Sequence, residues 1–423
     1  MKVCIRRGAK QIGGSAVEVF ADNGQRIVLD IGLPLDAEDN APDLLPDIKG
    51  LTEKTDDLLG ILISHAHQDH YAAGKRIDPA IPVFMGKATK TIMEVSRDFR
   101  LPSAFCFEKV ETFEARKPFT LGAFTITPYL TDHSAYDAYA FLIEADGKKL
   151  LYSGDFRAHG RKKKLFKANI RALPKGVDVL LMEGSCLGRE DDRFKTEEEL
   201  EDGFLNEFKR TKGLILVQPS MQNVDRIVTV YRACKKAGRK LVLPGYAAYL
   251  LMKLDNPRLP DLTWPDVKKF AAETQNRCSV SPEAIAADAG KYVVLLVKST
   301  FDALVKTDGL NDETLFVWSM WNGYKDRYAD RFEALNKAGV RCVDLHTSGH
   351  ADIPTLKKFV DGIAPKAVVP IHTFYPERFK DLFANAVLHD DNEIFETEYG
   401  NKQVAIRRTI EDNVSGSIKD ENG

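Results

Sequence analysis

The sequence has no long apolar run, no dense cysteine framework and no excess of charge of one sign. A bilayer-spanning helix needs about 20 consecutive apolar residues, and neither such a run nor the apolar core of a signal peptide occurs. We therefore expect a soluble protein with no membrane partner. The six cysteines form no C-x-x-C pair, which favours reduced thiols and a cytoplasmic location. A formal charge of −2 leaves nucleic-acid binding to local patches.

The length and composition indicate a folded chain with more than one compact unit. At 423 residues, of which 44% are hydrophobic and 29% charged, the chain is too long for one ordinary core and too apolar to be disordered. No internal repeat or long low-complexity segment is present. Two domains, or one large domain with an insert, are expected.

The first 190 residues favour β-structure. Runs at 14–20 and 26–31 are rich in β-branched residues and flank the turn signal Asp22-Asn-Gly24, so they predict a hairpin. The continuous apolar run 58–63 is typical of a strand buried on both faces. Further strands are predicted at 124–128, 138–144, 149–153 and 177–182.

From about residue 195 predicted helices and strands alternate, which is the pattern of a parallel α/β sheet. This alternation places an α/β insert at 191–342. After it the sequence predicts a helix at 353–363, a strand at 367–371 and a helix at 377–386, then a polar, flexible tail at 410–423. The elements expected within the insert are helices at 196–210, 224–234 and 325–337, and strands at 214–217, 240–243, 292–297, 315–319 and 340–345.

Four potential metal ligands directly follow the apolar run 58–63: His65, His67, Asp69 and His70. In an extended segment His65 and His67 point to the same side, and a turn near Asp69 redirects Asp69 and His70 to a second position. One loop can thus serve two adjacent ions. The alternative is an exposed polar loop whose side chains only form hydrogen bonds.

Three other candidates, His133, Asp155 and His372, each follow an apolar run. Histidine and carboxylate ligands suit zinc or manganese, and an aspartate shared by two ions would hold them about 3.5–4 Å apart. Asp155 is our choice for that bridge. Taken singly, each residue fits a structural role better, so the prediction depends on their occurring together.

These residues, in the order His65-x-His67-x-Asp69-His70, His133, Asp155 and His372, resemble the metal motifs of the metallo-β-lactamase superfamily. Further segments resemble the three motifs of its β-CASP subgroup, and in particular the ribonuclease J-like RNA-processing nucleases. Those segments are Glu183-Gly-Ser185, His346-Thr-Ser348-Gly-His350-Ala351 and Pro370-Ile-His372-Thr. The resemblance covers most of the chain.

The resemblance implies an αββα sandwich formed by residues 1–190 and 343–409, with the α/β segment 191–342 as a β-CASP cap. It implies two divalent ions, zinc or else manganese. One would be bound by His65, His67 and His133, the other by Asp69, His70 and His372, with Asp155 between them. It also implies hydrolysis of RNA, preferentially single-stranded, by a metal-bound hydroxide, and a homodimer is one possible assembly.

Within that scheme His350 is the candidate general acid, and Glu183 is its partner, favouring the charged imidazole. Asp69 counts as catalytic as well as a ligand. Ser348, Gly349 and His350 are expected to contact a substrate phosphate, although their turn also fits a plain helix cap. Two alternatives stay open: a hydrolase of the same fold acting on DNA or a small molecule, and a non-enzymatic binder with a degenerate site.

Other segments allow both functional and structural interpretations. The segment 318–327 fits either the stacking of nucleobases or internal packing; it contains Trp318, Trp321 and Tyr324 beside Lys325 and Arg327. It departs from the Gly-Ser-Gln-Gly-Glu type of loop that the resemblance leads us to expect there. The basic runs 161–164 and 235–240 fit either nucleic-acid contact or a solvated surface. His159 and His389 are expected to be structural or on the surface.

Overall fold

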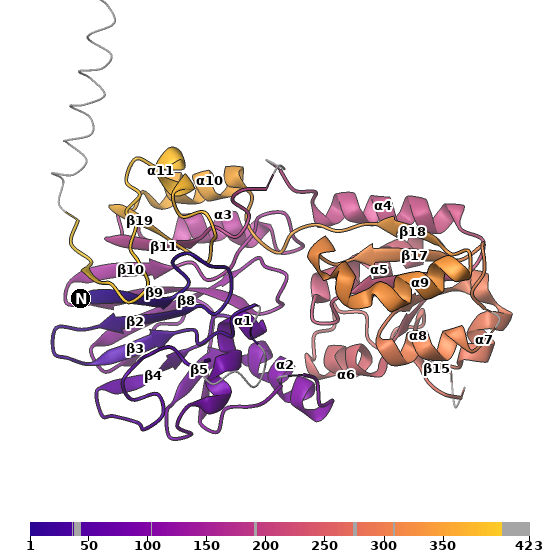
Figure 1. Ribbon diagram of the computed structural model, residues 1–423, viewed down its shortest axis with the longest axis horizontal. Coiled ribbons are helices and arrows are strands. Elements are labelled where there is room, and N and C mark those ends of the chain that lie inside the picture. Colours follow the sequence, from indigo (N-terminus) through magenta and orange to yellow (C-terminus); the bar gives the residue numbers. More distant parts are fainter. Residues whose placement is uncertain are drawn as a thin grey trace, which may run out of the picture.

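The computed structural model describes residues 1–35, 37, 44–102, 104–189, 193–273, 277–307 and 309–399. Figure 1 shows a β-sandwich on one side and an α/β cap beside it, with chain segments crossing between them twice. The expected tail at 410–423 lies outside the described residues.

The first sheet of the sandwich contains seven strands of the described chain, in the order β20-β1-β2-β3-β4-β5-β6. β2 and β3 form the predicted antiparallel hairpin, and Gly24 provides the positive φ of 86° in its turn. From β3 to β6 the strands run parallel. The strands are β1 (Lys2–Arg7), β2 (Ala16–Phe20), β3 (Arg26–Leu29), β4 (Leu58–Leu62), β5 (Val83–Gly86), β6 (Val110–Phe113) and β20 (Ile394–Glu396).

The second sheet has the order β19-β11-β10-β9-β8-β7. β8, β9 and β10 form an antiparallel meander, whereas β10, β11 and β19 are parallel neighbours. β8 therefore runs in the same direction as β10, β11 and β19, and all four end at the same edge. The strands are β7 (Phe119–Leu121), β8 (Phe124–Thr131), β9 (Ala138–Ala145), β10 (Lys148–Tyr152), β11 (Val179–Glu183) and β19 (Ala367–Ile371).

Apolar side chains alternate along the strands to fill the layers. Leu62 of β4 faces the core between the two sheets, whereas Ile61 and Ile63 face the helices on the outer side. The other sheet buries its outer face against a second set of helices. The result is an αββα sandwich, with α1 (Gln68–Tyr71), η1 (Ala72–Arg76) and α2 (Lys87–Asp98) on one side and α3 (Lys164–Ala172), α10 (Ile353–Ile363) and α11 (Arg378–Leu382) on the other.

Within the described part of the cap, seven strands form a parallel sheet in the order β15-β14-β13-β16-β12-β17-β18, with an apolar core on each face. Its strands are β12 (Ile215–Pro219), β13 (Lys240–Leu243), β14 (Val267–Phe270), β15 (Ser279–Val280), β16 (Tyr292–Leu295), β17 (Leu315–Ser319) and β18 (Arg341–Asp344). Its helices are α4 (Glu197–Arg210), α5 (Val224–Lys236), α6 (Gly245–Lys253), α7 (Pro282–Ala287), η2 (Ala289–Lys291), α8 (Lys298–Val305), η3 (Asn322–Tyr328) and α9 (Ala329–Lys337).

Several expected elements differ from the structure. The helix expected at 325–337 is divided into two elements, η3 and α9. The first, η3, is a 3₁₀ helix, a tighter turn that often precedes an α-helix. The helix expected at 377–386 ends at Leu382 because Phe383 is extended and buried. We propose the domain boundaries expected from the sequence, with the end of the cap moved from 342 to Asp344, where β18 stops pairing with β17.

None of the helices formed by the described residues combines the length and apolar character needed to cross a bilayer.

Candidate metal centre

The metal-ligand candidates gather where several strands end at neighbouring sheet edges. His133, Asp155 and His372 follow β8, β10 and β19, which point the same way in the second sheet. The loop carrying His65 leaves β4 of the first sheet, and Tyr139 donates its backbone N–H to Ser64 at 3.0 Å, joining the two sheets there. Strand direction therefore brings distant parts of the sequence to one place.

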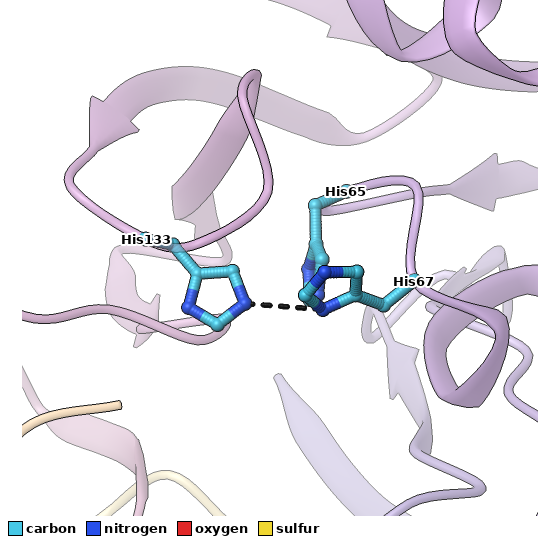
Figure 2. Close-up of side chains that lie close together, drawn as sticks. All are labelled: His65, His67 and His133. Carbon is cyan, nitrogen blue, oxygen red and sulfur yellow. Dashed lines mark hydrogen bonds between the residues drawn. The ribbon is translucent and has the colours of Figure 1, made fainter. Parts of the chain in front are cut away.

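His65, His67 and His133 form one group of candidate ligands, with ligand atoms within 4.8 Å of one another. Figure 2 shows the three imidazoles converging, with Nε2 of His133 3.2 Å from Nδ1 of His67. His65 and His133 are buried. The geometry can hold one metal ion.

Asp69, His70 and His372 form a second group within the same limit. Asp69 and His70 lie on α1, whose N-cap is His67, so the chain turns into a helix between the two ligand pairs. His372 has a positive φ of 56°, an unusual conformation for a non-glycine residue that is typical of functional sites. Its N–H donates to Gly8 O at 2.7 Å, which helps to hold this conformation.

Asp155 lies between the two groups. Its Oδ2 is 3.2 Å from Nε2 of His70 and 3.8 Å from Nε2 of both His65 and His372. Nε2 of His133 is 3.9 Å away. The structure thus brings together all seven residues that the sequence singled out as ligands, with the chosen bridge at their centre.

The donor set fits divalent cations. Both carboxylate oxygens of Asp155 and the Nε2 atoms of His65, His70 and His372 are buried without a hydrogen-bond partner. Buried polar atoms of this kind are costly unless something satisfies them. Nitrogen and carboxylate oxygen directed at shared points are what zinc or manganese requires.

The electrostatics of the group also favour cations. Burial lowers the pKa of His65 and of His133, and that of His67 to about 4, so these rings stay neutral with lone pairs available. Burial also lowers the pKa of His70, but Asp155 and Asp30 outweigh it and raise the value. A positive charge is favoured at that position.

Asp30 contacts a candidate ligand and was missed by the sequence interpretation. Its Oδ2 lies 2.7 Å from Nδ1 of His70, and it accepts hydrogen bonds from the hydroxyls of Ser64 and Tyr152, both at 2.7 Å. Such a carboxylate leaves Nε2 of the histidine free for a metal and fixes the ring. The sequence feature that could have identified Asp30 is its position directly after β3, because β3 is the parallel neighbour of β4, which leads to the His65 loop.

His350 and Glu183, the predicted acid and its partner, contact each other. Nδ1 of His350 lies 3.0 Å from Oε2 of Glu183 and 3.6 Å from Oδ2 of Asp155. Glu183 is buried and accepts hydrogen bonds from the Ser185 hydroxyl and the Phe156 N–H, so its position is fixed. Burial lowers the pKa of His350, but Glu183 and Asp155 raise it to about 8.

Ser348 is buried within the turn before His350. Its hydroxyl accepts the N–H of His350 at 3.1 Å, and its carbonyl accepts hydrogen bonds from Arg157 and His159 at 3.1 and 2.9 Å. His159 is therefore structural, as expected, and buried rather than on the surface. The Ser348 side chain shapes the turn.

Gly349 permits a close approach between the turn and the candidate metal ligands. Its carbonyl oxygen is 2.6 Å from Nδ1 of His133, which directs Nε2 of that ring toward the centre. A Cβ at Gly349 would lie 2.4 Å from Oγ of Ser134 and 3.3 Å from the His133 ring. Only glycine fits here without a shift.

The basic run at 161–164 joins the cap to the sandwich. Arg161 pairs with Glu201 of α4 at 2.5 Å, and Lys163 pairs with Glu198 at 3.0 Å. Lys162 donates to the Tyr136 carbonyl at 2.6 Å. Three of its four cations are therefore occupied by protein groups, which opposes the interpretation of this run as a nucleic-acid contact.

Comparison with known proteins agrees with this geometry. Residues 25–218 match a family model described as a β-lactamase superfamily domain, and residues 337–385 match a Zn-dependent metallo-hydrolase RNA specificity domain. The two models together cover more than half of the chain. The ribonuclease J of Mycobacterium tuberculosis (strain CDC 1551 / Oshkosh) is 25% identical over 392 residues, covering 88% of this chain and 68% of that protein.

Other relatives extend the comparison. The ribonuclease J of Mycolicibacterium smegmatis is 24% identical over 408 residues, covering 92% of this chain and 71% of that protein. A crystal structure of a protein of unknown function from Enterococcus faecalis V583 has the same fold, with a TM-score of 0.77 and 24% identity, covering 93% of this chain and 99% of its own. The chain is therefore a metal-dependent hydrolase that belongs to the metallo-β-lactamase superfamily, in its β-CASP, ribonuclease J-like branch.

Proposed function

We propose that the protein is a dinuclear-metal nuclease that hydrolyses phosphodiester bonds in RNA, with a preference for single strands. One observation carries the proposal: the buried carboxylate of Asp155 has no hydrogen-bond partner and faces imidazoles from both ligand groups. The names of the relatives, ribonuclease J, and of the RNA specificity domain support RNA as the substrate.

We assign His65, His67 and His133 to one ion, Asp69, His70 and His372 to the other, and Asp155 to both. Zinc is the proposed metal, with manganese as the alternative. When bound, the two ions supply a hydroxide nucleophile at neutral pH and neutralise charge on the phosphate oxygens.

The residues of the chain complete the reaction. His350 holds a proton on its ring and donates it to the leaving oxygen of the RNA. Glu183 orients His350 through the 3.0 Å contact to Nδ1 and favours the protonated ring. We propose that the turn Ser348-Gly349-His350 binds a non-bridging phosphate oxygen, with the Ser348 hydroxyl holding the turn in shape.

A second candidate is a phosphodiesterase of the same fold that acts on DNA or a small molecule. One observation favours the small-molecule form of this candidate: Arg161 and Lys163 pair with cap carboxylates instead of forming a free cationic track. A small substrate would not need such a track. The non-enzymatic alternative is abandoned because no ligand position has been lost.

Metal analysis and cleavage assays test the proposal. The purified protein is expected to contain close to two zinc or manganese ions, and Asp155→Ala is expected to contain fewer. His350→Ala should retain both ions but cleave labelled single-stranded RNA about 10²–10⁴-fold more slowly, the range for loss of a general acid. Loss of the ions in His350→Ala would refute our division between ligands and acid.

Matched substrates decide between the two candidates. Single-stranded RNA, DNA of the same sequence and a small activated phosphodiester are compared at equal concentration. Faster cleavage of RNA supports the first candidate, and turnover of the small substrate alone supports the second.

The cytoplasmic location expected from the cysteines stays a prediction.

A further inference from the structure

Three large, exposed apolar side chains lie near the candidate ligands Asp69 and His372, either in the chain or in space. Phe374 and Tyr375, which follow His372 closely, are 56% and 50% exposed. Leu35 is 46% exposed and borders Asp69, because a Cβ on Gly13 would lie 2.8 Å from Leu35 and 3.2 Å from Asp69. A group of large exposed apolar side chains indicates a contact surface.

The cap contributes two aromatic rings close to the turn that carries His350. Tyr324 of η3 is half-buried, and burial raises its pKa. The segment lies beside the turn that carries His350, because the carbonyl oxygen of Ser319, two residues before Trp321, is 3.3 Å from Nδ1 of His346. Trp321 makes an edge-to-face contact with Tyr324 at 5.4 Å and remains 49% exposed. Trp321 and Tyr324 together are called the aromatic rim.

The structure separates the aromatic residues that the sequence grouped together. Trp318 is 1% exposed and packs against Tyr328 and Phe332 in the cap core, so its stacking role is excluded. Trp321, three residues later, faces solvent. The base-stacking interpretation therefore applies to Trp321 and Tyr324 only.

A cation without an acidic partner accompanies the rim. The guanidinium of Arg327 lies 5.1 Å from the centre of the Tyr324 ring, and within the described part of the chain no carboxylate is in ion-pair contact with it. By contrast, neighbouring Lys325 pairs with Asp344 at 2.6 Å. Arg327 is thus available to a phosphate.

We propose that the aromatic rim stacks unpaired nucleobases of a single-stranded nucleic acid next to the scissile phosphate, while Arg327 contacts its backbone. The inference rests on the proposed function, since it names how that substrate is recognised. Every base offers a face for stacking, so this contact is tolerant of sequence and favours strands whose bases are not paired. A second copy of the chain is the alternative occupant, and the experiment below distinguishes it from a nucleic acid.

Binding of three ligands tests the rim directly: a single-stranded oligoribonucleotide, its duplex, and the same strand with abasic riboses. For Trp321→Ala the Kd of the single strand is expected to rise about 5-fold to 150-fold, the effect of losing one stacked base. Trp321→Phe should restore most of the affinity. The duplex and the abasic strand should bind Trp321→Ala and the unaltered protein equally, and Val305→Ala, an exposed cap residue on α8, should behave as unaltered.

Tryptophan fluorescence provides a second readout. The chain has three tryptophans, of which Trp318 is buried, Trp264 is half-buried and Trp321 is exposed. The single strand should therefore quench the emission of the unaltered protein, and Trp321→Phe should abolish most of that quenching.

Equal affinity of Trp321→Ala and the unaltered protein for the single strand would overturn the inference. So would a dimer that Trp321→Ala dissociates without a change in oligonucleotide binding, because the rim would then be an interface between copies. Turnover of a small activated phosphodiester reports on the metal centre separately. Its absence from the metal-loaded protein, together with uncut RNA, would refute the proposed function, whereas the binding comparison would still decide on the rim.

Discussion

Replacing Arg157 by methionine is expected to destabilise the protein by about 3–4 kcal/mol, near the lower end of the range for breaking a buried ion pair. Arg157 has no exposed side-chain surface and pairs with Asp225 at 2.9 Å, Asp132 at 3.4 Å and Glu197 at 3.5 Å. Its removal leaves Asp225 and Asp132 buried without their main partner. Glu197 keeps Arg226 at 3.0 Å, which limits the loss.

The control is Lys163→Met, which removes another cation from the same junction between sandwich and cap. The pair of Lys163 with Glu198 is exposed, with 43% and 46% of the side chains accessible, so its loss should cost about 0–1 kcal/mol. Urea unfolding of both variants and the unaltered protein measures the difference. If Arg157→Met lowers the free energy of unfolding by no more than Lys163→Met does, the buried network does not contribute the stability that we infer.

A double variant tests the cause. Arg157→Met combined with Asp225→Asn should be more stable than the sum of the two single effects predicts, by about 0.5–3 kcal/mol, because the uncompensated carboxylate is removed as well. Arg157→Met should also slow catalysis, since Arg157 donates to the Ser348 carbonyl at 3.1 Å and so supports the turn that carries His350.

Three further outcomes are expected. Removing the metal with a chelator should abolish hydrolysis and lower the midpoint of thermal unfolding, because the unpartnered ligand atoms lose their cation. Added zinc should restore both. An unchanged midpoint and unchanged activity would contradict the metal assignment. Asp30→Asn should weaken metal affinity about 10-fold to 100-fold, because the Asp30 carboxylate orients His70. Competition with a chelating dye measures this affinity. Glu183→Gln should move the alkaline limb of the pH–rate profile to lower pH. A general acid must be protonated, so activity falls as the pH rises through its pKa. Loss of the Glu183 charge lowers the pKa of His350 from about 8, and the limb moves with it. A limb that stayed in place would refute that acid assignment.

Residue types and their spacing determined the chemistry that the site can perform. The His65 loop after an apolar strand, and the single candidates after other strands, were recognisable because metal ligands need particular donor atoms and buried strands need continuous apolar runs. The alternation of helices and strands predicted the parallel sheet of the cap for the same kind of reason.

Tertiary structure decided which side chains meet. The parallel pairing of β11 with β19 sets Glu183 opposite Ile371 and so brings it beside the loop of His372, a neighbour relation that neither local segment encodes. Asp30, Arg157 and Trp321 acquire their roles in the same way, as an orienting carboxylate, a buried junction and an exposed ring. Periodicity reports only whether a residue faces a core, whereas contacts across sheets and domains depend on strand order and on how the cap packs against the sandwich.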